Sequence, residues 1–134
     1  MPVDERILGF SNRWYPAAIE AAQTVDIAGH DVRVVTPALF IATKLDAFHG
    51  RGGGDIVASH DLEDIVAVVD GRREIVSEVA AASVDVRDYI ASQLRALLDS
   101  RDFTEALAGF LLPDAASQGR RSLLEGRLRS LTLP

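Results

Sequence analysis

Two helical patterns separated by a run of glycines constrain the fold of this chain more than any other feature. They occupy residues 36–71, which read TPALFIATKLDAFHGRGGGDIVASHDLEDIVAVVDG. Thr36 precedes a proline, which is typical of a helix start, because threonine caps well and proline fits the first helical position. The glycines that begin at Gly50 end that helix, Ser59 can cap a second one, and Gly71 closes it. We therefore predict two helices joined by a short glycine-rich loop.

The segment before these helices predicts a β-hairpin. Residues 22–27 and 31–35 alternate around β-branched side chains and flank a turn at Ala28-Gly29-His30. A single hairpin is only marginally stable in water. We therefore expect this one to belong to a larger sheet or to pair with strands of another chain.

Helical patterns dominate the rest of the sequence. Further helices are predicted over about 72–81, 85–98, 102–110 and from 113 onward, where a Pro-Asp pair opens the last of them. The predicted fold class is α+β, with the hairpin inside residues 1–35 and a mainly helical region of about five helices over residues 36–134. We expect both parts to form a single domain.

Composition places the chain among globular proteins. Its 134 residues are 48% apolar and 25% charged, and it has no cysteine, which excludes disulfides and thiolate metal sites. No apolar run approaches the length of a membrane span, and the N-terminal residues lack the pattern of a signal peptide. We expect a soluble, cytoplasmic protein that does not engage membranes.

The balance of charge argues against broad binding to nucleic acid. The formal net charge is −6, whereas binding to a phosphate backbone needs a positive face. Four arginines near the C-terminus are the exception, and they either form a small basic patch or belong to a solvated helix face, which is the commoner use of mixed charge. They are Arg120, Arg121, Arg127 and Arg129.

Lys44 is the first candidate for a functional residue, since it lies in the middle of an otherwise apolar helix. A lysine in such a place can extend its ammonium group to water, pair with a carboxylate, or present a point charge to a phosphate. The first two uses are the more common ones. The sequence leaves all three open.

Acidic residues at the start of the second helix are the natural partners of this lysine. Asp61 and Asp64 are three residues apart and so share one helix face, and Asp61 lies in the first turn, where the helix dipole favours a negative charge. They are either ordinary residues of a helix start or carboxylates that hold Lys44 for a phosphate. His60 is a supporting candidate that can pair with Asp64, or is simply exposed.

The glycine-rich loop resembles a phosphate-binding loop only in part. No lysine follows its glycines, as the G-x-x-x-x-G-K-[ST] motif requires, so the glycines are better explained by a tight reversal of the backbone. Arg51 lies within the loop and can reach an anion. The three histidines lack the spacing of metal ligands, so we predict no metal site in the sequence.

The sequence of these helices resembles the second half of the nucleotidyltransferase-like proteins of the AbiEii toxin group, in the minimal nucleotidyltransferase superfamily. The resemblance rests on ATKL at 42–45 and HDLEDI at 60–65, in that order and after a strand and a Thr-Pro pair. It covers about residues 1–80. It implies transfer of a nucleotidyl group from a nucleoside triphosphate to an unidentified acceptor, with Mg²⁺ as cofactor.

Roles for individual residues follow from the resemblance. Lys44 would contact the triphosphate together with Arg51, and Asp61 would be the supporting carboxylate of the catalytic site, with His60 and Asp64 around it. Positioning and charge stabilisation dominate this kind of transfer, which suits a lysine and magnesium ions.

The chain departs from the family's pattern in its metal-binding half. The family has a Gly-Ser dipeptide followed by paired aspartates, and no Gly-Ser dipeptide occurs here. The resemblance implies that the missing carboxylates precede Met1, so that the hairpin is the remnant of a nucleotidyltransferase sheet. Apolar surface left uncovered costs about 25 cal/mol per Å². We therefore predict either a homodimer or a rearranged core that buries Trp14, Phe10 and the hairpin.

Overall fold

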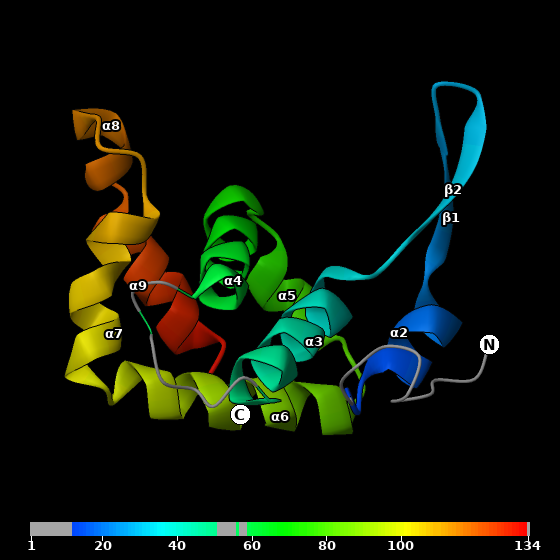
Figure 1. The fold of residues 1–134 in the computed structure, drawn as a ribbon, viewed down its shortest axis with the longest axis horizontal. Coiled ribbons are helices and arrows are strands. Elements are labelled where there is room, and N and C mark those ends of the chain that lie inside the picture. Colours follow the sequence, from blue (N-terminus) through cyan, green and yellow to red (C-terminus); the bar gives the residue numbers. More distant parts are fainter. Residues whose placement is uncertain (1–11, 51–55, 57–58, 134) are drawn as a thin grey trace.

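The fold of the chain is α+β, as predicted: an antiparallel hairpin precedes a mostly helical region (Figure 1). The structure is a computed structural model that describes residues 12–50, 56 and 59–133. Its elements, in chain order, are α2 (Tyr15–Ala21), β1 (Gln23–Ile27), β2 (His30–Val34), α3 (Pro37–Gly50), α4 (His60–Gly71), α5 (Ile75–Ala80), α6 (Val84–Leu98), α7 (Arg101–Ala106), the 3₁₀ turn η1 (Leu107–Phe110), α8 (Ala115–Gln118) and α9 (Arg121–Ser130). Phe10 lies outside the described residues.

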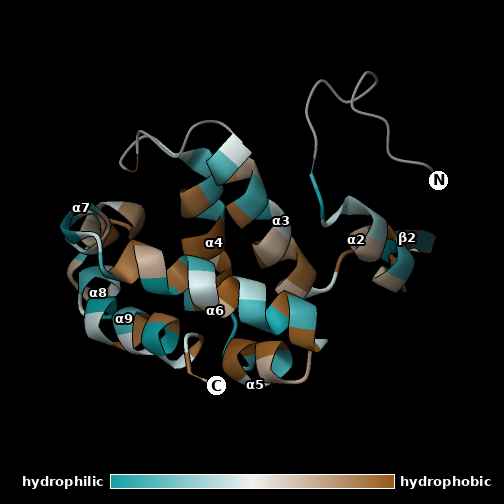
Figure 2. Ribbon diagram, turned by 90° about the horizontal axis from the view of Figure 1, so that it is seen from below, coloured by the Kyte–Doolittle hydropathy of each residue, from teal (hydrophilic) through white to brown (hydrophobic). Residues whose placement is uncertain are grey.

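The core is built from the apolar faces of the long helices. Helix α3 packs against α4, α5 and α6, while α9 packs against α4 and α6. In Figure 2 the hydrophobic residues of α4 and α6 face the middle of this helical group. The residues at the centre are almost completely buried, at 0–1% exposure: Ile41, Leu45, Ile65, Val69, Ile90, Leu94, Phe103, Leu107, Leu124 and Leu128.

The hairpin is held by its register and its turn. β1 and β2 are antiparallel, with Val25 opposite Val32 and Ile27 opposite His30. Ala28 and Gly29 both have positive φ, 53° and 83°, which is the geometry of a two-residue type I′ turn. The predicted hairpin is therefore present where the alternating pattern placed it.

The hairpin is not buried in the chain, which contradicts the predicted rearranged core, while the homodimer stays a prediction. Every residue of β1 and β2 is exposed, and Figure 1 shows the two strands extending away from the helices. Trp14 is buried as expected, at 6% exposure, but it packs against α6 rather than against the strands. No rearranged core covers the hairpin: every strand residue stays exposed, and the Arg33 side chain only reaches the carbonyls of Ile19 and Ala22 at the end of α2.

The described residues just before α2 are anchored to two helices. The Asn12 side chain donates to the carbonyl of Thr43 over 2.9 Å, and the Arg13 N–H donates to Oδ2 of Asp46 over 3.0 Å. The Arg13 guanidinium lies 4.8 Å from the ring centroid of Tyr89 on α6. These contacts hold the N-terminal end of the described chain against α3 and α6.

Tyr89 makes the stability of this contact depend on pH. Burial raises the pKa of Tyr89 to about 12, the Asp46 carboxylate adds to the rise, and Arg13 opposes it. The hydroxyl donates to Oδ1 of Asp46 over 3.4 Å. Because the folded-state pKa lies above that of the unfolded chain, the contribution of Tyr89 is complete below about pH 10 and is lost as the pH rises towards 12.

We expect Tyr89→Phe to remove this pH dependence. The wild-type free energy of unfolding should fall more steeply than that of the variant between about pH 9.5 and 11.5. Urea denaturation at a series of pH values measures both slopes. Parallel slopes for the two proteins would show that the tyrosine ionises equally easily in both states.

Candidate functional site

The start of α4 faces the middle of α3, and this contact positions the candidate residues. Ser59 caps α4 as predicted: its hydroxyl accepts a hydrogen bond from the Leu62 N–H over 3.2 Å. The cap sets the phase of the helix, so that Leu62 enters the core while Asp61 turns towards α3. Lys44 lies on the facing side of α3.

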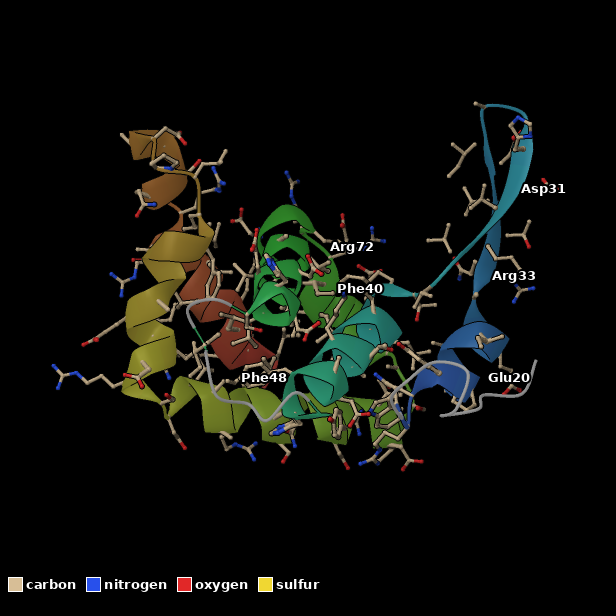
Figure 3. The ribbon with its side chains drawn as sticks, in the orientation of Figure 1. Glu20, Asp31, Arg33, Phe40, Phe48 and Arg72 are labelled. Atoms are coloured by element: carbon tan, nitrogen blue, oxygen red, sulfur yellow. The ribbon has the colours of Figure 1, made fainter. Side chains whose placement is uncertain are left out.

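Lys44 joins the two aspartates in one cluster. Its Nζ is 2.8 Å from Oδ2 of Asp64 and 4.0 Å from Oδ1 of Asp61. The ammonium group also lies 5.5 Å from the ring centroid of Phe40, one turn earlier on α3, which Figure 3 labels. Both aspartates that the sequence offered as partners of Lys44 therefore lie beside it. We call Lys44, Asp61 and Asp64 the Lys44 cluster.

The two carboxylates differ in exposure. The Asp61 side chain is 7% exposed, whereas those of Asp64 and Lys44 are 45% and 29% exposed. Asp61 is thus a fixed, buried carboxylate in the first turn of α4, where the helix dipole favours its charge. Asp64 can leave the lysine for water at little cost, because exposed ion pairs contribute little. The cluster consequently offers an ammonium group with one permanent and one exchangeable partner.

His60 does not belong to this cluster: of the two predicted alternatives, the exposed residue is confirmed and the pairing with Asp64 is not observed. Its Nδ1 lies 3.5 Å from Oε2 of Glu63, and its side chain is 92% exposed. The first residue of α4 projects into solvent, away from the face that carries Asp61. Arg51, the other predicted phosphate contact, lies outside the described residues.

The Lys44 cluster does not fit a magnesium site. Both aspartates share the lysine, and no group of three or more His, Asp or Glu side chains that could hold a metal ion occurs within residues 12–50, 56 and 59–133. Mg²⁺ needs carboxylate oxygens that are free to coordinate it. We therefore assign no metal ligand to these residues and derive no reaction step through a metal.

Two of the four C-terminal arginines, Arg120 and Arg127, connect helices, whereas Arg129 pairs with Glu125 within α9 itself. Arg120 makes a bidentate contact with Asp70 at 3.0 and 3.2 Å, and its pKa is raised by that hydrogen bond. Arg127 donates to the carbonyls of Val69 and Asp70 over 3.1 and 2.8 Å, which caps the C-terminal end of α4. The sequence could not show this role, because the arginines are 50 or more residues away from the acceptors.

A groove elsewhere on the surface is separate from the Lys44 cluster. It encloses about 490 Å³ between α2, the start of α3 and the start of α6, and alanines make up much of its lining together with Glu20. None of the three cluster residues lines it.

No helix in the described part of the chain is long and apolar enough to cross a membrane.

Comparison with known proteins adds no relative. No protein-family profile, no curated protein and no solved structure matches this chain.

Proposed function

We propose that the chain is the nucleotide-binding part of a nucleotidyltransferase-like protein, and that Lys44 contacts the phosphates of a nucleoside triphosphate. One observation carries the proposal: the ammonium group of Lys44, whose side chain is 29% exposed, lies between a buried and an exposed carboxylate. The same residues carry the resemblance to the AbiEii toxin group. The protein would be cytoplasmic and would transfer the nucleotidyl group to an acceptor molecule.

The asymmetry of the two aspartates suits this role. A phosphate that approaches from solvent can replace Asp64, whose contact with Lys44 is exposed, while the buried Asp61 keeps the lysine oriented. A lysine binds phosphate as a point charge and needs this kind of orientation from its neighbours. Asp61 is accordingly a supporting residue. In the family, Mg²⁺ accompanies the triphosphate and neutralises its developing charge.

Competition between phosphate and Asp64 leads to a direct test. We expect wild-type chain to bind a triphosphate saturably, measured by equilibrium dialysis with each of the four nucleotides, with and without Mg²⁺. Lys44→Met should weaken binding by at least about tenfold, because it removes a charge-assisted contact. Asp64→Asn should bind as tightly as wild type or more tightly, since it removes the competing carboxylate.

A matched control separates the site from the overall charge. Arg101→Met removes a positive charge from an exposed ion pair with Glu105 on α7, away from the Lys44 cluster. It should leave nucleotide binding unchanged. Equal nucleotide binding by wild type and Lys44→Met, or no binding at millimolar nucleotide, would show that the Lys44 cluster is only a structural ion pair.

The alternative function is that of a non-catalytic interaction module. It is favoured by the hairpin, because both of its faces are exposed and the described sheet contains no third strand. Such a two-stranded unit has open edges, which are templates for pairing with another chain. The Lys44 cluster has no role in this alternative function.

A further inference from the structure

We propose that the outer edge of β2 pairs with the same edge of a second copy of the chain, antiparallel and centred on Val32. The inference rests on the interaction function given above as the alternative, and it is independent of nucleotide binding. It specifies the partner, the strand and the register.

Exposed apolar side chains concentrate on this part of the molecule. Among the described residues, seven of the ten large apolar side chains that are well exposed lie on the hairpin, on α2, just after β2 or at the start of α6: Ile19, Val25, Ile27, Val32, Val34, Val35 and Val84. Figure 1 shows the hairpin clear of the helices, so a second chain can reach its edge.

The turn determines which backbone groups of β2 face outward. In a two-residue hairpin the residues that flank the turn, here Ile27 and His30, exchange hydrogen bonds with each other. Alternation along the strand then points the N–H and C=O groups of Val32 towards β1 and those of Asp31 and Arg33 outward. A register centred on Val32 places Asp31 opposite Arg33 of the second copy, and both residues present the groups needed for a hydrogen-bonded pair.

Charge selects this register over its neighbours. Centring the pair on Asp31 or on Arg33 would place two like charges directly opposite each other, which is destabilising. Centring it on Val32 instead forms two Asp31–Arg33 pairs, one on each side of the two-fold axis. Figure 3 shows both side chains on the free hairpin, Asp31 near the turn and Arg33 nearer to α2.

The pairing also relieves a repulsion inside the hairpin. Asp26 lies directly opposite Asp31 in the register of β1 and β2, a like-charge pair. Arg33 of the second copy would neighbour Asp31 on the same face. Arg33 donates to the carbonyls of Ile19 and Ala22 through Nη2, both over 3.0 Å, so its Nε and Nη1 donors face no acceptor in the described residues.

The opposite face of the joined sheet becomes apolar and continuous. Val25 lies beside Val32 in the hairpin, and they are 41% and 39% exposed. In the proposed register Val32 meets Val32 of the second copy, which forms a central row of four valines. Strands of five residues bury less than the roughly 1,200 Å² of a standard interface. We therefore expect a weak dimer that depends on concentration.

Charge exchange tests the register. Asp31→Arg would put an arginine opposite Arg33 of the second copy, and Arg33→Asp would put an aspartate opposite its Asp31, so each variant alone should associate at least about tenfold more weakly than wild type. An equimolar mixture should recover the association as a heterodimer, because every pair then joins opposite charges. Sedimentation equilibrium of the two variants and of the mixture measures this.

A second experiment captures the dimer even if it is weak. The chain has no cysteine, so Val32→Cys carries a single thiol. Opposed residues of a non-hydrogen-bonded pair have Cα atoms about 4.5 Å apart, within the range for a disulfide. Mild oxidation should link Val32→Cys into a dimer and leave Val25→Cys monomeric, since position 25 lies three strand spacings from its counterpart.

The two experiments have clear opposing outcomes. Recovery of association in the mixture, with disulfide formation at position 32 and not at 25, supports the proposal. A mixture no more associated than its components, or equal cross-linking at both positions, overturns it. If the chain still dimerises in that case, the interaction function remains supported, but the proposed edge and register are wrong. Neither result bears on the binding of nucleotide by Lys44.

Discussion

Replacing Phe103 by alanine is expected to lower the free energy of unfolding by about 3–5 kcal/mol. Phe103 on α7 is 1% exposed and is one of the largest fully buried side chains of the core. Truncation removes a ring from a packed environment and leaves a cavity that rigid neighbouring helices cannot fill. Domains are usually stable by only about 5–15 kcal/mol, so the variant should lose a large part of its stability.

An exposed leucine provides the control for this experiment. Leu112 is 69% exposed, so Leu112→Ala should change the free energy of unfolding by no more than about 0.5 kcal/mol. Urea denaturation followed by circular dichroism measures both variants. Similar, small effects at the two positions would contradict the packing of α7 against the body of the protein.

Lys44→Met is expected to destabilise the chain by about 1–3 kcal/mol, because it removes the ammonium group that neighbours both the buried Asp61 carboxylate and Asp64. This loss of stability is smaller than for a fully buried ion pair, because the Lys44 side chain is 29% exposed. Asp64→Asn should cost much less, since Asp64 is 45% exposed. Chemical denaturation of both variants measures the difference.

A double-mutant cycle isolates the pair itself. Adding Asp61→Asn to Lys44→Met removes the buried carboxylate whose contact with Lys44 the first substitution deleted, so the double variant should be more stable than the sum of the two single effects predicts. Strictly additive effects would mean that Lys44 and Asp61 do not interact in solution, and the geometry of the cluster would then be wrong.

Local patterns were sufficient to predict the helices around the candidate site. Ser59 caps α4 because its hydroxyl meets an N–H three residues later, and the i, i+3 spacing puts Asp61 and Asp64 on one face. The approach of Lys44 to this face is consistent with the short stretch of sequence between the mostly apolar helix α3 and the amphipathic helix α4. Each of these features depends on residues close together in the sequence.

Features that depend on distant residues were not predictable. The exposure of the hairpin could not be deduced from its alternating pattern, which is the same whether a second layer covers it or not. The last predicted helix is divided into α8 and α9, and Asp114 caps the first of these short helices through the Ser117 N–H. The role of Arg127 likewise depends on carbonyls at the end of α4.

One measurement tests the proposed nucleotide site most directly, because Lys44 is the only lysine in the chain. Protein labelled with ¹⁵N and ¹³C in lysine gives a single side-chain ¹⁵Nζ signal in its NMR spectrum, and this signal reports on the ammonium group of Lys44. The account predicts that this signal shifts saturably as nucleoside triphosphate is added, and that Asp64→Asn saturates at the same or a lower concentration. An unchanged signal at millimolar nucleotide would contradict it.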